Sequence, residues 1–195
     1  MKYKSLPYLA IIIAVCFTIT RGKMETAAFS TIKIGMNYLQ NVNRTIFHNY
    51  WDPKSGCDLF MEFPFYFGTI KTGLHLFSYK SRESGVPGFR TYFYYIGWGL
   101  EVPLIKILKS YWGFSIGSHQ MTFDDKEINE TQVTESELSS SFDAGLRFKI
   151  RRQTYLHLGS NYLIIYTHKR IELFFISFGI ATLFKTPGWL RKFLE

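Results

Sequence analysis

The sequence predicts an all-β protein, specifically an eight-stranded antiparallel up-and-down transmembrane β-barrel. Bulky apolar residues alternate with small or polar residues along eight segments, as is typical of strands between two different environments. Most of these segments have roughly ten residues, the length that a tilted membrane strand needs. Of the 195 residues, 18% are aromatic, yet the mean hydropathy is only −0.02. Such values are expected of a membrane barrel, because the hydropathies of lipid-facing and lumen-facing residues average out. No run in the sequence reaches the about 20 apolar residues that a transmembrane helix needs.

Residues 1–28 are predicted to be a secretory signal peptide. Two early lysines precede the apolar run LAIIIAVCF, and a basic start followed by a short apolar region is typical of such signals. We expect cleavage between residues 20 and 28. Cys16 lies in this leader, so the mature chain would keep only Cys57 and would have no internal disulfide.

The barrel is expected to occupy residues 30–184, and its last segment, 170–184, shows the alternation best. Bulky residues at even positions would face lipid, whereas Ser177, Gly179 and Ala181 would face a narrow packed lumen. The inward face of the third segment is ambiguous. A polar loop containing Pro53 and Gly56 follows the first segment, and an acidic loop spans about 120–138. The seven preceding segments lie at about residues 30–38, 59–67, 72–80, 89–102, 112–117, 142–149 and 155–165.

The connections between these segments alternate in length. Those after the first, third, fifth and seventh segments include the two longest, whereas those after the second, fourth and sixth are mostly short. Short periplasmic turns and longer outer loops are typical of outer-membrane barrels. We therefore expect the outer membrane of a Gram-negative bacterium, with both chain termini in the periplasm because the strand count is even.

The even-numbered segments share an internal repeat. We interpret it as one hairpin geometry used four times, whose last copy must close the ring by joining the first strand. The alignment places Glu62, Glu101, Arg147 and Ala181 at one equivalent position. The four copies are FMEFPF (60–65), GLEVPL (99–104), GLRFKI (145–150) and GIATLF (179–184).

With its leader, its eight alternating segments and the stretch SFGIATLF (177–184), the chain resembles the small outer-membrane barrels of the OmpA transmembrane-domain and OmpX type. The even segments also resemble a broad outer-membrane barrel family of Bacteroidota. Ser177, Gly179 and Phe184 resemble the assembly signal of such barrels, so the resemblance implies the barrel-assembly machinery as a partner during biogenesis. The chain departs from that signal at Thr182 and continues with TPGWLRKFLE.

A cluster of charged residues shares the parity expected to face the lumen. An eight-stranded barrel is just wide enough for side chains to fill it, and charges buried there must pair because desolvation is costly. We interpret this lumen charge cluster as a plug of ion pairs that sets the register. The alternative is a gated pore whose ion pairs exchange partners. Its three acids and three bases are Lys33, Glu62, Glu101, Asp143, Arg147 and Lys149.

His157 and Ser160 are a candidate esterase pair, because HLGSN (157–161) resembles the His-x-Ser-Asn stretch of outer-membrane lipid A deacylase barrels. In those barrels the His and the Ser lie two residues apart and share a face. Here they lie three apart, so they would point to opposite sides of a regular strand. Because a nucleophile needs its base within hydrogen-bond reach, we expect no catalytic residues and no enzyme.

Two further segments are charged but suggest no cofactor. The acidic residues of 124–137 could bind Ca²⁺ or Mg²⁺, but their spacing fits no EF-hand, so we expect a solvated loop and no metal. The tail 185–195 is expected to be an amphipathic helix on the inner leaflet or, alternatively, a frayed end. The formal net charge of +8 arises from scattered basic residues, so no nucleic-acid partner is expected.

Taken together, these patterns predict a monomeric integral outer-membrane protein in contact with outer-membrane lipid. The predicted role is structural, adhesion-type or surface interaction. Two alternatives remain open at this point: a narrow channel or transporter for small solutes, and a membrane-embedded lipid-modifying enzyme.

Overall fold

The structure, a computed structural model, describes residues 28–123 and 134–194. Nearly all of the predicted signal peptide, 1–28, and much of the predicted acidic loop therefore lie outside the described residues. In the part of the chain that is described, no helix is long and apolar enough to cross a membrane.

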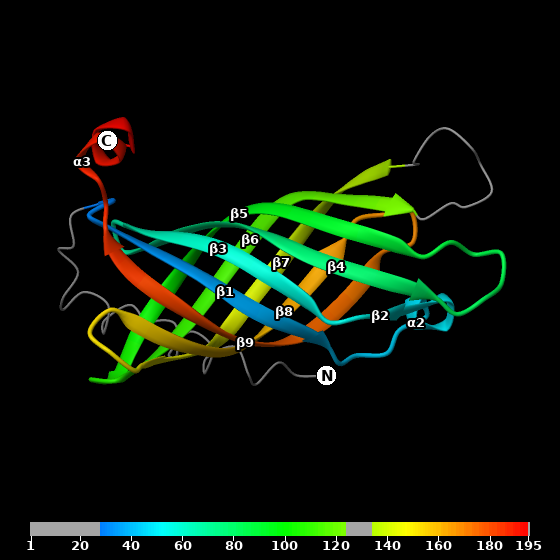
Figure 1. The fold of residues 1–195 in the computed structure, drawn as a ribbon, viewed down its shortest axis with the longest axis horizontal. Helices are drawn as coiled ribbons and strands as arrows, with labels where there is room; N and C mark the ends of the chain where they lie inside the picture. The colour runs from blue at the N-terminus through cyan, green and yellow to red at the C-terminus, as the bar shows by residue number, and fades with distance from the viewer. Residues whose placement is uncertain (1–27, 124–133, 195) are drawn as a thin grey trace, which may run out of the picture.

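Eight long antiparallel strands close into a ring (Figure 1), which confirms the predicted fold class. The order around the ring is β4-β3-β1-β9-β8-β7-β6-β5, and β5 pairs with β4 to complete it. The strands are β1 (Thr31–Asn41), β3 (Gly56–Phe65), β4 (Gly68–Ser81), β5 (Phe89–Ile105), β6 (Leu108–Phe123), β7 (Thr134–Lys149), β8 (Thr154–Ile165) and β9 (Ile171–Lys185).

The last strand joins the first, as the repeat predicts. All of β1 pairs with β9, from Thr31 opposite Lys185 to Asn41 opposite Phe175. Because every strand of the ring has two neighbours, the ring leaves no long unpaired edge that could aggregate.

The two ends of the barrel differ in their connections (Figure 1). At the end where β1 begins and β9 finishes, here called the terminal end, the turns are the short segments 66–67, 106–107 and 150–153. At the opposite end, here called the loop end, the connections are 42–55, 82–88, 124–133 and 166–170. The alternation of connection lengths is therefore as predicted.

The first connection is more ordered than the predicted polar loop. It contains the helix α2 (Phe47–Tyr50) and the short strand β2 (Trp51–Pro53). β2 pairs with residues Tyr79–Ser81 of β4. The pairing between β3 and β4 stops before this point, at Cys57 opposite Leu76, so β2 supplies hydrogen-bond partners to an edge that would otherwise be open.

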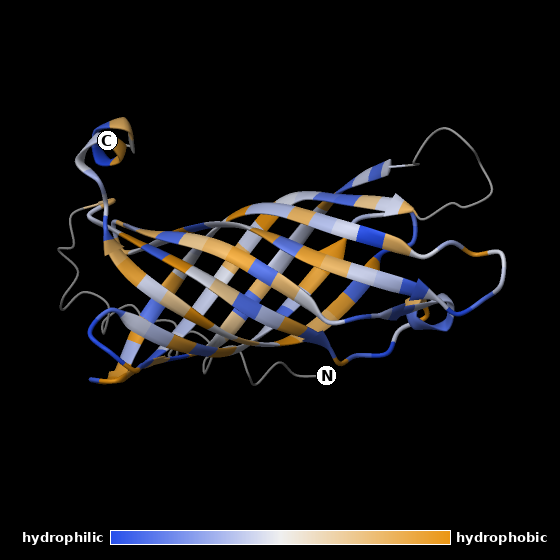
Figure 2. Ribbon diagram, in the orientation of Figure 1, coloured by the Kyte–Doolittle hydropathy of each residue, from blue (hydrophilic) through white to orange (hydrophobic). Residues whose placement is uncertain are grey.

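Hydrophobic and hydrophilic residues alternate along the strands (Figure 2), and this alternation corresponds to the outer and inner faces of the barrel. On β9, Phe178 is 52% and Ile180 is 48% exposed on the outer wall, whereas Ser177 and Ala181 are buried. The predicted faces of this strand are therefore confirmed over its central part. β4 and β6 extend beyond the predicted segments 72–80 and 112–117 at both ends.

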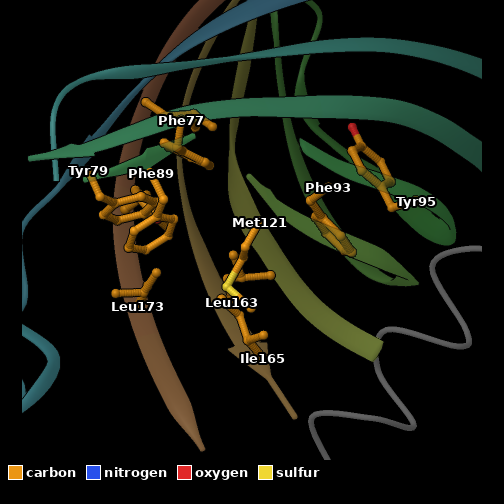
Figure 3. Packing of buried hydrophobic residues seen from close by; sticks show 11 residues of the cluster. Phe77, Tyr79, Phe89, Phe93, Tyr95, Met121, Leu163, Ile165 and Leu173 are labelled. Carbon is orange, nitrogen blue, oxygen red and sulfur yellow. The ribbon is translucent and has the colours of Figure 1, made fainter. Parts of the chain in front are cut away.

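The interior near the loop end is filled by large apolar side chains, here called the apolar plug (Figure 3). We expected a lumen face of small residues on β9, but Leu173 and Phe175 of this strand point inward and are fully buried. The small residues occur only nearer the terminal end. The plug comprises Leu39, Phe77, Tyr79, Phe89, Phe93, Tyr95, Met121, Leu163, Ile165, Leu173 and Phe175.

After β9, the chain turns into the short helix α3 (Gly188–Leu194), which stands off the terminal end in Figure 1. Trp189 is 72% and Phe193 is 81% exposed. The helix therefore carries large apolar side chains that the barrel does not cover.

Candidate functional site

Five charged side chains form a connected set of ion pairs inside the terminal half of the barrel. Arg147 of β7 donates two hydrogen bonds to the carboxylate of Glu62 on β3, one of them 2.7 Å long, and it also contacts Glu101 on β5. Lys33 of β1 bridges the same two carboxylates, with its Nζ 3.1 Å from Glu62 Oε2. Lys109 of β6 donates to the other oxygen of Glu101 at 2.9 Å. These pairs connect opposite walls of the ring.

Three further charged side chains form a second layer on the loop-end side of the first. Lys71 of β4 has its Nζ 3.5 Å from a carboxylate oxygen of Asp58 and 3.8 Å from one of Asp143. Asp58 also accepts hydrogen bonds from the Tyr95 hydroxyl at 2.6 Å and from the Asn37 amide at 2.9 Å. Asp143 accepts a hydrogen bond from the Asn161 amide at 2.7 Å. Each carboxylate of this layer therefore has a cation and at least one neutral donor around it.

We call these eight residues the lumen charge network. The side chains of Glu62 and Arg147 are each only 3% exposed, so their charges depend on partners within the protein rather than on water. The charges balance, since the four bases Lys33, Lys71, Lys109 and Arg147 face the four acids Asp58, Glu62, Glu101 and Asp143.

The network contains five of the six residues of the predicted lumen charge cluster. Lys149 is the exception: it has the same parity but is exposed at the end of β7. None of the ion pairs found within residues 28–123 and 134–194 includes it. Arg147 contacts both Glu62 and Glu101, the residues that the repeat places at equivalent positions.

Three members of the network were missed at the sequence level, and each lies just outside a predicted segment. Lys71 precedes the segment predicted at 72–80, and Asp58 precedes the one predicted at 59–67. Lys109 lies three residues before the segment 112–117. All three share the parity of inward residues on their strands. Extending the strands by one to three residues would have found Asp58 and Lys109, whereas Lys71 also required knowing the inward face of the third segment.

Other side chains pack closely against the network. A small cavity beside it, lined by Lys71, Asp143 and Arg147 among others, has a volume of about 20 Å³, enough for one water molecule. The Arg147 guanidinium stacks 4.3 Å above the Tyr111 ring. This ring lies against the wall where Gly145 and Gly159 have no side chains; a Cβ at Gly159 would be 2.4 Å from the Tyr111 hydroxyl.

His157 and Ser160 do not form a catalytic pair. His157 is 1% exposed inside the barrel and stacks on Phe60, with ring centroids 5.3 Å apart. Ser160 has the opposite parity and donates to the Ala144 carbonyl on the neighbouring strand at 3.4 Å. The barrel wall therefore separates the two side chains, as their spacing predicts.

The remaining predicted positions are distributed along the strands. Ser177 is buried in the lumen, Gly179 lies against Asn37, and Phe184 is 48% exposed on the outer wall. Of the acidic segment, residues 124–133 lie outside the described part of the chain, while Glu135 and Glu137 belong to β7. Within the described residues, no group of three or more His, Cys, Asp or Glu side chains is placed to hold a metal ion.

Solved structures of the same architecture include the Neisserial surface protein NspA, with a TM-score of 0.52 and 10% identity over 78% of this chain and 95% of that one. The N-terminal barrel domain of Pseudomonas aeruginosa OprF has a TM-score of 0.51 and 10% identity, over 80% of this chain and 99% of that one. The Yersinia pestis outer membrane protein Ail in a phospholipid bilayer nanodisc has a TM-score of 0.51 and 13% identity, over 80% of this chain and 99% of that one. No family model and no curated protein matches the sequence. The fold is that of the small outer-membrane β-barrels.

Proposed function

We propose that this chain is an integral outer-membrane protein with a closed lumen and a structural or surface-interaction role. The observation that carries the proposal is the filled interior. The lumen charge network occupies the terminal half and the apolar plug occupies the loop half. A barrel filled in this way can hold a shape in the membrane but has no continuous water path for solutes.

The outer wall supports a membrane location. On β6 the outward residues Trp112, Phe114 and Ile116 are apolar and 42–54% exposed, and lipid is the environment in which such a band is stable. Further along the same strand the outward positions are polar, at Ser118, Gln120 and Thr122. The loop end of β6 therefore extends past the apolar band and would be available for contacts outside the membrane.

Single-channel recording in planar bilayers tests the closed lumen. We expect the refolded full chain to give no conductance above that of the bare bilayer, and the same for Glu101→Gln. If the unmodified chain opens in discrete steps and Glu101→Gln changes those steps, the gated channel is the correct function instead. A shift in gel mobility on boiling checks in parallel that each sample is a folded barrel.

Cysteine labelling in whole cells tests location and orientation. The native thiol would be removed by Cys57→Ser, and a single cysteine introduced at Ser84 in the loop-end turn 82–88 or at Lys106 in the terminal-end turn 106–107. We expect a membrane-impermeant maleimide to label the Ser84→Cys chain in intact cells and the Lys106→Cys chain only after lysis. The reverse pattern would contradict the orientation that we propose, in which both chain termini and the terminal-end turns lie in the periplasm.

The surface role has a separate test. A deletion strain would be complemented either with the unmodified chain or with a chain in which a Gly-Ser linker replaces residues 82–88. The unmodified chain should restore the attachment or surface phenotype. The linker chain should not restore it, although it still forms a heat-modifiable barrel. The lipid-modifying alternative predicts instead an altered lipid mass spectrum in the deletion strain. It has no geometric support at His157 and Ser160, which lie on opposite sides of the wall.

A further inference from the structure

A pocket of about 710 Å³ opens at the loop end of the barrel, well away from the lumen charge network. One wall comes from α2 and β2, the floor from the ends of β5 and β6, and the other wall from β7, β9 and the turn before β9. Its lining includes Phe47, Trp51, Phe89, Phe123 and Ile171. We call this cavity the loop-end pocket.

Ring contacts and a hydrogen bond fix the aromatic side chains of the apolar wall of the pocket. The rings of Phe47 and Trp51 stack with centroids 5.2 Å apart, and the edge of Trp51 meets Phe89 at 5.5 Å. The indole nitrogen of Trp51 donates a hydrogen bond to the Pro87 carbonyl at 3.0 Å, which fixes the ring. The surface is therefore ordered before any ligand arrives, and such preorganisation lowers the cost of binding.

The pocket is closed at its base. Phe89 and Met121 form the floor and are only 3% and 4% exposed. Beneath them lies the rest of the apolar plug (Figure 3), including Phe93, which is fully buried. A molecule in the pocket would be held there rather than passed into the lumen.

Among the described residues, the charged part of the lining carries two positive and two negative groups. Arg170 lies 3.9 Å from Glu172, and Glu172 accepts a hydrogen bond from the Tyr162 hydroxyl at 2.7 Å. Lys169 and Glu135 complete the set. Because these charges cancel, the pocket favours a ligand without net charge.

We propose that the loop-end pocket binds a small, neutral, largely apolar molecule that contains a ring system. The volume lies within the range of about 300–1,000 Å³ typical of small-molecule sites, and the Phe47, Trp51 and Phe89 rings offer faces and edges for stacking. An anionic lipid would place its charge beside the Glu135 and Glu172 carboxylates as well as beside Lys169 and Arg170. The segment 124–133, DDKEINETQV, is too polar in sequence to complement the aromatic wall.

Methyl NMR of the full chain in phosphatidylcholine nanodiscs tests this proposal, with naphthalene as the probe. The methyl groups of Met121 in the floor and Ile171 in the wall report on the pocket. We expect saturable shifts of both, with a Kd below about 1 mM. 2-Naphthoate and 2-naphthylmethylammonium have the same ring system with opposite charges and should each bind at least tenfold more weakly.

A matched pair of variants separates pocket binding from partition into lipid. Ile46→Glu changes a lining residue that is 78% exposed, so the barrel should fold, and it should weaken naphthalene binding at least fivefold. Ile107→Glu makes the same change in the terminal-end turn, where the side chain is 58% exposed, and should leave binding unchanged. A gel-mobility shift on boiling confirms that both variants are folded.

Three results would overturn the proposal. The first is the absence of saturable shifts at Met121 and Ile171 in the folded chain. The second is equal or tighter binding of 2-naphthoate, which would assign the pocket to an anionic lipid or acid. The third is binding that occurs only after residues 124–133 are replaced by a Gly-Ser linker, which would make this segment the occupant. These outcomes do not depend on the closed-lumen proposal, which conductance tests independently.

Discussion

Arg147→Met should destabilise the barrel more than any other single change in the lumen charge network. Arg147 contacts both Glu62 and Glu101, and its removal leaves three bases against four acids. Glu62, which is 3% exposed, would keep Lys33 at 3.1 Å as its remaining ion-pair partner. Breaking a buried ion pair by removing one partner costs about 3–5 kcal/mol, so we expect a loss of about 4 kcal/mol in the free energy of unfolding.

Urea unfolding in lipid vesicles measures this loss, with tryptophan fluorescence and gel mobility as the two probes. With an m-value of about 2 kcal/mol/M, the midpoint should fall by about 2 M. The double variant Arg147→Met/Glu62→Met restores the charge balance and should lose less than the sum of the two single changes. Lys149→Met, on the same strand but exposed, should stay within about 0.5 kcal/mol of the unmodified chain.

A midpoint for Arg147→Met equal to that of Lys149→Met would refute this reasoning. It would mean that water reaches the network and solvates the unpaired carboxylates, which a filled lumen does not permit. Strict additivity in the double variant would equally show that Arg147 and Glu62 are not energetically coupled.

Three further predictions concern other parts of the barrel. Gly159→Ala places a Cβ 2.4 Å from the Tyr111 hydroxyl and should cost about 1–3 kcal/mol in urea unfolding; adding Tyr111→Phe should recover part of this loss, and no recovery would show that the strain lies elsewhere. Burial, aided by a nearby arginine, lowers the pKa of His48 from its usual 6.5, so the fold favours the neutral ring, and the stability this provides is lost as pH falls below about 6.5. The Thr45 amide donates a hydrogen bond to His48 Nδ1 at 2.9 Å. The hydrogen-exchange protection factor of this amide should therefore fall as the pH drops below about 6.5, whereas in His48→Gln it should not change with pH. In a variant that keeps Trp189 as its sole tryptophan, lipids brominated near the headgroup should quench the fluorescence if α3 lies on the membrane, whereas a frayed tail predicts no quenching.

The sequence predicts which strand residues face outward or inward better than it predicts which side chains fill the lumen. Strand parity is a local property, so the outward apolar residues and the inward position of Glu62, Glu101 and Arg147 could be read directly from alternation. The repeat added one long-range fact, because equivalent positions on hairpins of similar geometry lie at one level. Together these two patterns point to Glu62, Glu101 and Arg147, and in the structure the Arg147 side chain contacts both glutamates.

What the sequence could not predict depends on where strands end and how they are staggered. Barrel strands are tilted, so a residue at the start of one strand can lie level with the middle of another. Lys71 and Lys109 therefore reach the network from strand starts that alternation alone does not delimit. Lys149 shows the opposite case. It has the parity of an inward residue, but it lies at the end of β7, where its side chain is exposed. The apolar plug was also missed, because its inward aromatic residues look like lipid-facing ones when each strand is considered alone.

The lumen charge network has a consequence for the order of events during folding. Glu62 and Arg147 are 85 positions apart, and Lys33 and Glu101 are 68 apart, so no single hairpin contains both members of either pair. A half-formed sheet would therefore expose unpaired charges at the depth of the hydrocarbon, where each costs several kcal/mol. Hairpins inserted one at a time would meet this barrier repeatedly. The chain should instead cross the membrane as a nearly complete ring, with neutralisation of the interior and pairing of β1 with β9 occurring in the same late step.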